Sequence, residues 1–174
     1  VVAEVQTAGR GRLNRHWQSP PGNLYCSVVL RPDCEARRCA QLSFAAALAA
    51  AEAVAEIIPQ SDVRLKWPND VLAGGRKIAG LLLEAAPVAA AQIPWVVVGC
   101  GLNIGVHPEY RESPATSLAG TGRSSTGNSG SSVSRSRMNT CAIFVKTATA
   151  GMTRPLRCTV MSEGCDATSK SHRS

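Results

Sequence analysis

The sequence lacks two features that would connect it with a membrane. No uncharged apolar run reaches about 18 residues, the length that a membrane-spanning helix needs. The first residues also lack the basic, apolar and small-residue order of a secretory signal peptide. These absences predict a soluble, cytoplasmic protein with no membrane partner. A methionine is missing from position 1 as well, where Val1 opens an apolar stretch, so we expect that the upstream end of the domain is missing.

A disulfide framework is also missing. The cysteines number seven, an odd count, and no two of them form a CxxC pair. Cys26, Cys34, Cys39 and Cys100 lie in or beside apolar segments. Buried thiols in a reducing compartment are therefore the simplest interpretation.

Acidic residues are scarce only in the last third of the chain. Residues 1–119 hold 11 Lys and Arg against 10 Asp and Glu, whereas residues 120–174 hold 8 against 2. The net charge of +7 thus belongs almost entirely to the tail. It says little about what the rest of the chain binds.

The tail also has little to build a core from. Residues 120–138 are nearly all Ser, Gly, Thr, Asn and Arg, and Phe144 is the one aromatic residue after position 119. Such a composition buries too little apolar surface to offset the entropy of ordering. We predict a domain over residues 1–119, followed by a low-complexity tail over 120–174 that is disordered or translated out of frame, with one strand at 141–145.

The pattern of residues 1–119 favours strands over helices. The clearest helix is predicted over residues 35–58, which are rich in alanine and place these residues near helical spacing: Leu42, Ala45, Ala46, Ala49, Ala53 and Ile57. Strands are predicted at 1–6, 24–30, 63–65, 71–72, 77–84 and 95–99, with a hairpin turn at Gly74-Gly75. We therefore expect an α+β fold, with a mixed, mostly antiparallel sheet and helices packed on one face.

The first segment that suggests chemistry is Gly9-Arg10-Gly11-Arg12, which leads on to Trp17. Glycines let the backbone approach a ligand closely, and guanidinium groups donate charge-assisted hydrogen bonds to carboxylates or phosphates. This pattern suits an anionic small molecule. A solvated basic loop or an RNA-contacting loop would have the same composition, and Trp17 alone could be a core or rim residue.

The second segment is Lys66-Trp67-Pro68-Asn69-Asp70, between two predicted strands. A lysine at a strand end is most often a surface charge, and Asp70 could simply cap a turn. Their combination with a carboxamide and a proline-fixed turn nevertheless indicates a site for hydroxyls or a magnesium ion.

The third segment is Gly99-Cys100-Gly101-Leu102-Asn103, directly after an apolar run. Its GxGxxG pattern does not indicate dinucleotide binding, because His107-Pro108 makes a following helix unfavourable. We predict a glycine-rich turn that exposes Asn103 as part of a ligand wall, although a plain tight turn is an alternative.

Taken together, these segments resemble biotin-protein ligases. The resemblance is carried by their order, by residues 77–84 (Lys-Ile-Ala-Gly-Leu-Leu-Leu-Glu) and by residues 114–118 (Pro-Ala-Thr-Ser-Leu). It covers about residues 1–119. It implies the catalytic fold of biotin and lipoate ligases, which is similar to that of class II aminoacyl-tRNA synthetases.

The resemblance also implies a reaction and its participants. Biotin would be activated with ATP and Mg²⁺ to biotinyl-5′-AMP and transferred to a lysine of a biotin carboxyl carrier domain, without a covalent enzyme intermediate. A homodimer is compatible with the family, whereas no helix-turn-helix pattern is visible in the 174 residues, so we expect no DNA-binding domain.

Residue roles follow from the family motifs. Lys66, Arg12 and Arg10 would be catalytic, with Lys66 between the biotin carboxylate and the α-phosphate. The predicted biotin contacts are Gln6, Arg10, Gly11, Arg12 and Lys66. The predicted ATP contacts are Trp17, Asn69 and Asn103, and no metal ligand is assigned.

The chain also departs from the family pattern. An upstream strand with a Thr-Asn element and a small C-terminal barrel domain are not recognisable in it. A non-catalytic biotin-binding fragment, a lipoate-ligase-like enzyme and an RNA-binding module based on the basic loop and tail are therefore alternatives.

Overall fold

A six-stranded sheet organises the part of the chain that the structure describes. This computed structural model describes residues 1–32, 35–87, 93–109 and 114–121. The strands lie in the order β1-β2-β6-β5-β4-β3, and every neighbouring pair is antiparallel. Their bounds are Val2–Ala3 (β1), Leu24–Leu30 (β2), Val63–Lys66 (β3), Asp70–Ala73 (β4), Arg76–Ala85 (β5) and Val96–Leu102 (β6). The predicted α+β class is confirmed.

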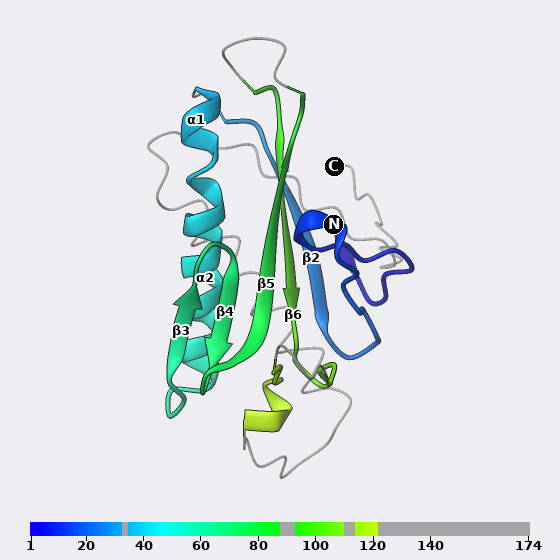
Figure 1. Ribbon diagram of the computed structural model, residues 1–174, viewed down its shortest axis with the longest axis vertical. Helices are drawn as coiled ribbons and strands as arrows, with labels where there is room; N and C mark the ends of the chain where they lie inside the picture. Colours follow the sequence, from blue (N-terminus) through cyan, green and yellow to red (C-terminus); the bar gives the residue numbers. More distant parts are fainter. Residues whose placement is uncertain (33–34, 88–92, 110–113, 122–174) are drawn as a thin grey trace, which may run out of the picture.

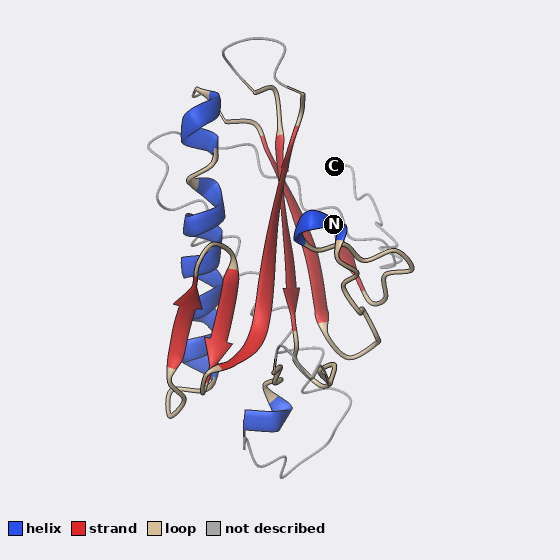
Figure 2. Cartoon of the chain, in the orientation of Figure 1, coloured by secondary structure: helices blue, strands red, loops and turns tan. Residues whose placement is uncertain are grey.

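The two α-helices lie end to end beside the sheet. Helix α1 spans Ala36–Cys39 and α2 spans Leu42–Ile57, and Figures 1 and 2 show them end to end on one side. The continuous helix predicted over 35–58 is therefore interrupted. At the junction the amides of Gln41 and Phe44 bond to carbonyls three residues back, as in a 3-10 turn.

Alanine lets α2 approach the sheet closely. Its buried stripe is centred on Ala46, Ala50 and Ala53, and it packs mainly on β3, β4 and β5. Ala45, one of the residues near helical spacing, is exposed because it lies beside this stripe. The strands contribute the larger core side chains, among them Leu24, Val28, Leu30, Val71, Ile78, Leu81, Val96, Val98 and Leu102. The predicted burial of Cys26, Cys39 and Cys100 is confirmed.

Within the described residues, one helical stretch is long and apolar enough to cross a membrane. It is Ala36–Ile57, with a mean hydropathy of 1.3, and it meets this test by length and composition only. The core helix of a soluble protein passes the same test, and here the alanine stripe is buried against the sheet. The stretch therefore carries no argument for a membrane.

Two predicted strand ends differ from the structure. The strand predicted over residues 1–6 is limited to the two residues of β1. Strand β6 continues through Gly99 and Gly101 to Leu102, whereas the prediction ended it at a glycine turn. Because β6 is hydrogen-bonded along its length to both β2 and β5, the two ladders override the low strand propensity of glycine. The predicted Gly74-Gly75 turn is confirmed, with φ of 56° and 75°.

The predicted tail is outside the described residues, apart from a short 3-10 turn, Ala119–Thr121. The domain boundary at Ala119, the low-complexity character beyond it and the strand at 141–145 therefore stay predictions.

Asn23 fixes the loop after β6. Its Oδ1 accepts hydrogen bonds from the backbone amides of Ile104, Gly105 and Val106, at 2.8, 3.1 and 3.2 Å. The side chain is only 1 % exposed. One oxygen thus accepts from three backbone amides, of which that of Gly105 also donates to the Gly22 carbonyl at 3.1 Å, and this arrangement holds the end of β6 against the start of β2.

Replacing Asn23 should therefore destabilise the fold. Asn23→Ala is expected to lower the free energy of unfolding by about 2 kcal/mol, because the buried Ile104 amide would be left without this acceptor, and a buried donor without an acceptor costs roughly 1–3 kcal/mol. Urea denaturation followed by circular dichroism measures this loss. Gln60→Ala removes an exposed carboxamide and should change stability by less than about 0.5 kcal/mol. Equal losses for the two variants would contradict the assignment.

Candidate active site

The sheet face opposite α2 is hollowed because small residues line up across it. Antiparallel register places Gly80 of β5 directly opposite Gly101 of β6, and Leu82 opposite Gly99. The neighbouring positions, such as Leu81 and Cys100, belong to the core on the helix side. A pocket of about 1310 Å³ lies on the glycine face.

A short hairpin made by residues 9–17 covers this pocket. The amide of Trp17 donates to the Gly9 carbonyl at 2.9 Å, and that of Gly11 donates to the Arg15 carbonyl at 2.7 Å. Leu13, at the tip, has a φ of 57° and is exposed. The predicted Gly-Arg loop is thus an ordered hairpin, which lies across the sheet from α2 (Figure 1).

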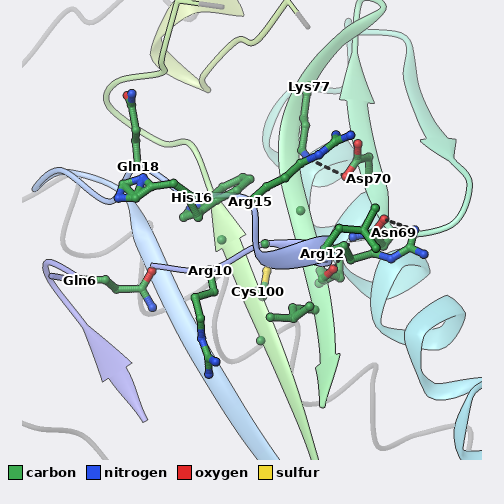
Figure 3. Close-up of a pocket in the computed structure, with 18 of the residues that line it drawn as sticks. Gln6, Arg10, Arg12, Arg15, His16, Gln18, Asn69, Asp70, Lys77 and Cys100 are labelled. Carbon is green, nitrogen blue, oxygen red and sulfur yellow. Dashed lines mark hydrogen bonds and ion pairs between the residues drawn. The ribbon is translucent and has the colours of Figure 1, made fainter. Parts of the chain in front are cut away.

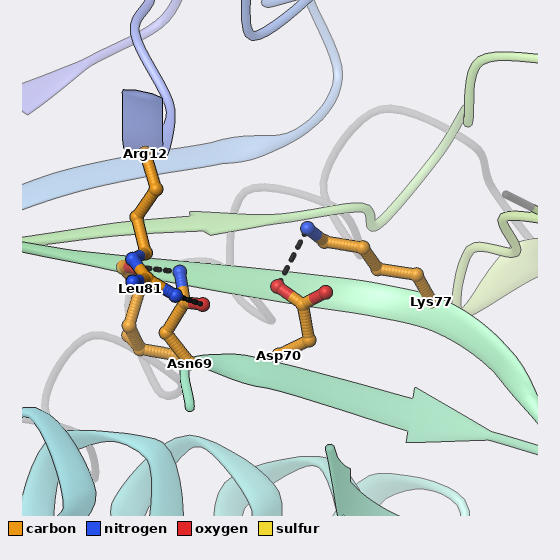
Figure 4. Close-up of polar contacts among 5 residues, drawn as sticks. All are labelled: Arg12, Asn69, Asp70, Lys77 and Leu81. Carbon is orange, nitrogen blue, oxygen red and sulfur yellow. Dashed lines mark hydrogen bonds and ion pairs between the residues drawn. The ribbon is translucent and has the colours of Figure 1, made fainter. Parts of the chain in front are cut away.

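Polar side chains link the hairpin to the sheet. The Arg10 guanidinium lies 3.2 Å from the Glu84 carboxylate, and Arg12 donates to the side-chain oxygen Oδ1 of Asn69 at 3.5 Å. Asn69 in turn donates to the Leu81 carbonyl at 2.6 Å (Figure 4). Because the Arg10 pair is exposed, it adds little to stability, and its carboxylate is readily exchanged for a ligand anion.

Trp17 lies flat on the glycine pair. A Cβ on Gly101 would be 2.6 Å from the indole Nε1, and one on Gly80 would be 3.0 Å from Cζ3. The Lys77 ammonium lies 5.2 Å from the indole centroid and 2.6 Å from the Asp70 carboxylate. Gly80 and Gly101 are therefore required to be glycine as long as the indole occupies this position.

Positive charge dominates the pocket. Its charged lining residues are Arg10, Arg12, Arg15, Lys66 and Lys77, against Asp70 and Glu84. Figure 3 shows Gln6 and Arg10 on one side of the space, and Arg12 beside Asn69, together with Asp70 and Lys77, on the other. Lys66, at the end of β3, is exposed. Such a lining favours an anionic ligand.

Asn103 differs from its predicted exposure. It is 2 % exposed, and its side-chain amide donates to the Thr116 carbonyl at 3.0 Å. The expectation of an exposed Asn103 was wrong because residues 114–118 pack over it. These residues also clamp β5, since the Lys77 amide donates to the Pro114 carbonyl and the Thr116 amide to the Lys77 carbonyl.

The eight residues assigned to substrate contacts all line the one pocket, although they come from distant parts of the chain. They are Gln6, Arg10, Gly11, Arg12, Trp17, Lys66, Asn69 and Asn103. Their individual roles stay predictions. The sequence reasoning gave no role to Lys77 or Glu84, although both belong to the segment that carried the resemblance.

A dedicated metal cage is not evident. Within the described ranges, no group of three or more His, Cys, Asp and Glu side chains is placed to hold an ion. The Asp70 carboxylate is already paired with Lys77. A magnesium ion that entered on nucleotide phosphates would fit this lining, since Mg²⁺ keeps several waters and uses only one or two protein carboxylates.

The fold and the pocket define a class of protein: an α+β domain with a cation-rich pocket between an antiparallel sheet and an arginine-bearing hairpin. Residues 1–103 match the biotin/lipoate A/B protein ligase family. The chain belongs to this family.

Individual relatives agree with this assignment. The biotin--[acetyl-CoA-carboxylase] ligase of Paracoccus denitrificans is 44% identical over 110 residues, which cover 63% of this chain and 45% of that protein. The ligase of the same name from Mycobacterium tuberculosis is 44% identical over 126 residues, covering 70% and 45%. A biotin protein ligase structure from Aquifex aeolicus superposes with a TM-score of 0.61 and 31% identity, covering 83% of this chain and 60% of that one. The chain thus spans less than half the length of the curated relatives it matches.

The hairpin geometry leads to a prediction about two glycines. A Cβ at Gly9 would lie 2.4 Å from the Trp17 carbonyl oxygen and 2.6 Å from the Ser19 hydroxyl, whereas one at Gly11 would be no closer than 3.5 Å to any atom. Gly9→Ala should therefore open the hairpin at a cost of about 2 kcal/mol, as overpacking does. Trypsin cleavage after Arg10, Arg12 and Arg15 should become faster.

Gly11→Ala is the matched control. Its backbone is extended, with a φ of −109°, so an alanine fits without strain. Cleavage in this variant should match that of the unsubstituted chain. If both alanines accelerated cleavage equally, the close approach at Gly9 would not be what closes the hairpin.

Proposed function

We propose that this domain activates biotin with MgATP to biotinyl-5′-AMP and then transfers the biotin to a lysine of a biotin carboxyl carrier domain. One observation carries the proposal. The arginine hairpin and Lys66, which are more than 50 positions apart, line the same pocket of about 1310 Å³ over a glycine floor. A pocket of this size, rich in cations, suits a nucleotide and a carboxylate together.

The first step joins two anions, and this is its main electrostatic obstacle. The biotin carboxylate attacks the α-phosphorus of ATP, the bond to the β-phosphate oxygen breaks and pyrophosphate leaves. Lys66 would neutralise the carboxylate and the α-phosphate together, while Arg10 and Arg12 would offset the charge on the departing pyrophosphate. Glu84 would be displaced from Arg10 in this step.

The remaining contacts are those that the resemblance to the family implies. Gln6 and Gly11 would bind biotin near the hairpin. Trp17, Asn69 and Asn103 would lie on the nucleotide side, Asn103 by shaping the wall since its amide is engaged. Magnesium would enter as part of the MgATP substrate.

The second step needs no covalent bond to the enzyme. The amine of the acceptor lysine attacks the biotinyl carbonyl, an amide forms and AMP leaves with the bonding electrons. Because no nucleophile of the chain takes part, the site needs only to hold the adenylate and admit the acceptor. A carrier domain of a cytoplasmic carboxylase is the proposed partner, and we place the reaction in the cytoplasm.

The comparisons support this proposal at the level of the family. Two curated relatives are named as ligases acting on acetyl-CoA carboxylase, and the Aquifex aeolicus protein is described in complex with biotin and ATP.

Pyrophosphate release tests the proposal. The 174-residue chain with biotin and MgATP should release pyrophosphate, and Lys66→Ala should reduce the rate by about 100-fold, a loss typical of removing one charged group from a reaction centre. Arg64→Ala is the control, since Arg64 lies on the same strand outside the pocket lining. It should stay within about 2-fold of the unsubstituted chain.

The same assay separates the alternatives. No release by folded chain, together with retained biotin binding, would indicate a non-catalytic binding fragment. Release with lipoate in preference to biotin would reassign the substrate. Equal losses for Lys66→Ala and Arg64→Ala would remove Lys66 from the site.

A further inference from the structure

The side chains of Trp17 and Lys77 meet above one glycine, and Lys77 also pairs with Asp70. At Gly80 a Cβ would lie 3.0 Å from Cζ3 of Trp17 and 3.3 Å from both Cε and Nζ of Lys77. The Lys77 ammonium also reaches the Asp70 carboxylate, at 2.6 Å. Asp70, Lys77 and Trp17 thus form a continuous contact from β4, across β5, to the stem of the hairpin.

The middle member of this contact is held firmly. The Lys77 backbone is hydrogen-bonded to Pro114 and Thr116, at 2.9 and 2.8 Å. Its side chain is about a quarter exposed, and that of Asp70 is a fifth exposed. The ion pair is therefore better shielded than the three other ion pairs of the described residues, whose side chains are 46% exposed or more.

The indole, by contrast, has no hydrogen bond of its own. Trp17 Nε1 is buried, and no atom of the described residues accepts its proton. What holds the ring is its fit on Gly80 and Gly101 and the Lys77 ammonium 5.2 Å from its centroid, within the range of a cation–π contact.

We propose that Lys77 and Asp70 are positioning residues, which hold the Trp17 indole on the glycine pair and so keep the hairpin that carries Arg10 and Arg12 closed over the pocket. Asp70 fixes the ammonium, the ammonium fixes the ring, and the ring anchors the hairpin stem. An effect of these residues on the rate of biotin activation rests on the proposed function. Their effect on the position of the Trp17 ring and the hairpin does not.

Tryptophan fluorescence tests the conformational part. The sequence has three tryptophans, so the double substitution Trp67→Phe and Trp95→Phe leaves Trp17 as the only emitter. In this background Lys77→Met should shift the emission to longer wavelength and increase quenching by acrylamide, because the ring leaves the sheet. Lys77→Arg retains a cation and should keep most of the original signal. Asp70→Asn should give an intermediate change.

Two glycines of β6 provide a second test that leaves the charges intact. Gly101→Ala should dislodge the ring, because its Cβ would lie 2.6 Å from the indole, whereas Gly99→Ala meets only ordinary contacts from 3.6 Å. The first variant should reproduce the fluorescence of Lys77→Met and the second should not. Arg37→Met, which breaks an exposed ion pair on α1, is the charge-loss control.

Kinetics test the catalytic part. Lys77→Met should lower kcat/KM for pyrophosphate release by about 10-fold, a loss in proportion to one shielded cation–π contact, and Lys77→Arg should restore most of it. An unchanged Trp17 signal in Lys77→Met and Gly101→Ala overturns the proposal, even if the chain is an active ligase. A shifted signal in a chain that releases no pyrophosphate supports the positioning role and contradicts the proposed function instead.

Discussion

The site depends on one feature of strand pairing: the register that sets Gly80 against Gly101. Two side chains at these positions would fill the space in which the Trp17 indole lies. Without the indole on the sheet, the stem of the hairpin would lose its platform, and the positions of Arg10 and Arg12 would depend on their exposed contacts with Glu84 and Asn69. A change of one residue in register would turn core side chains such as Leu81 and Cys100 onto this face.

The two faces of the sheet have different roles: one packs against α2 to form the core, and the other forms the floor of the pocket. One face is closed by α2, whose alanines allow close packing and whose position fixes β3, β4 and β5. Among the described residues, the other face is covered by the hairpin, which is held there by polar contacts and by the Trp17 ring. Such a cover has few buried apolar contacts, so it opens more easily than the core. The proposed reaction, which must admit ATP, biotin and then an acceptor domain, needs this property.

The two ion pairs of the pocket also differ in their exposure to solvent. Five cationic side chains and two carboxylates line the space. The Glu84 carboxylate is paired with Arg10 and the Asp70 carboxylate with Lys77. The exposed Arg10–Glu84 pair is weak enough to exchange for a substrate anion, whereas the shielded Asp70–Lys77 pair is better suited to structure. Ion pairs that look equivalent in the sequence thus serve different purposes according to their burial.

The sequence by itself determined the local elements and the family motifs. Glycine pairs predict tight turns, alanine runs predict a helix, and the Gly-Arg-Gly-Arg and Lys-Trp-Pro-Asn-Asp segments indicate a site, because each of these depends on neighbouring residues. Tertiary structure alone decided three things: that β6 continues through its glycines, that Asn103 is buried, and that Lys77 reaches both Trp17 and Asp70. These depend on partners from distant segments, whose placement follows from register and packing rather than from local pattern.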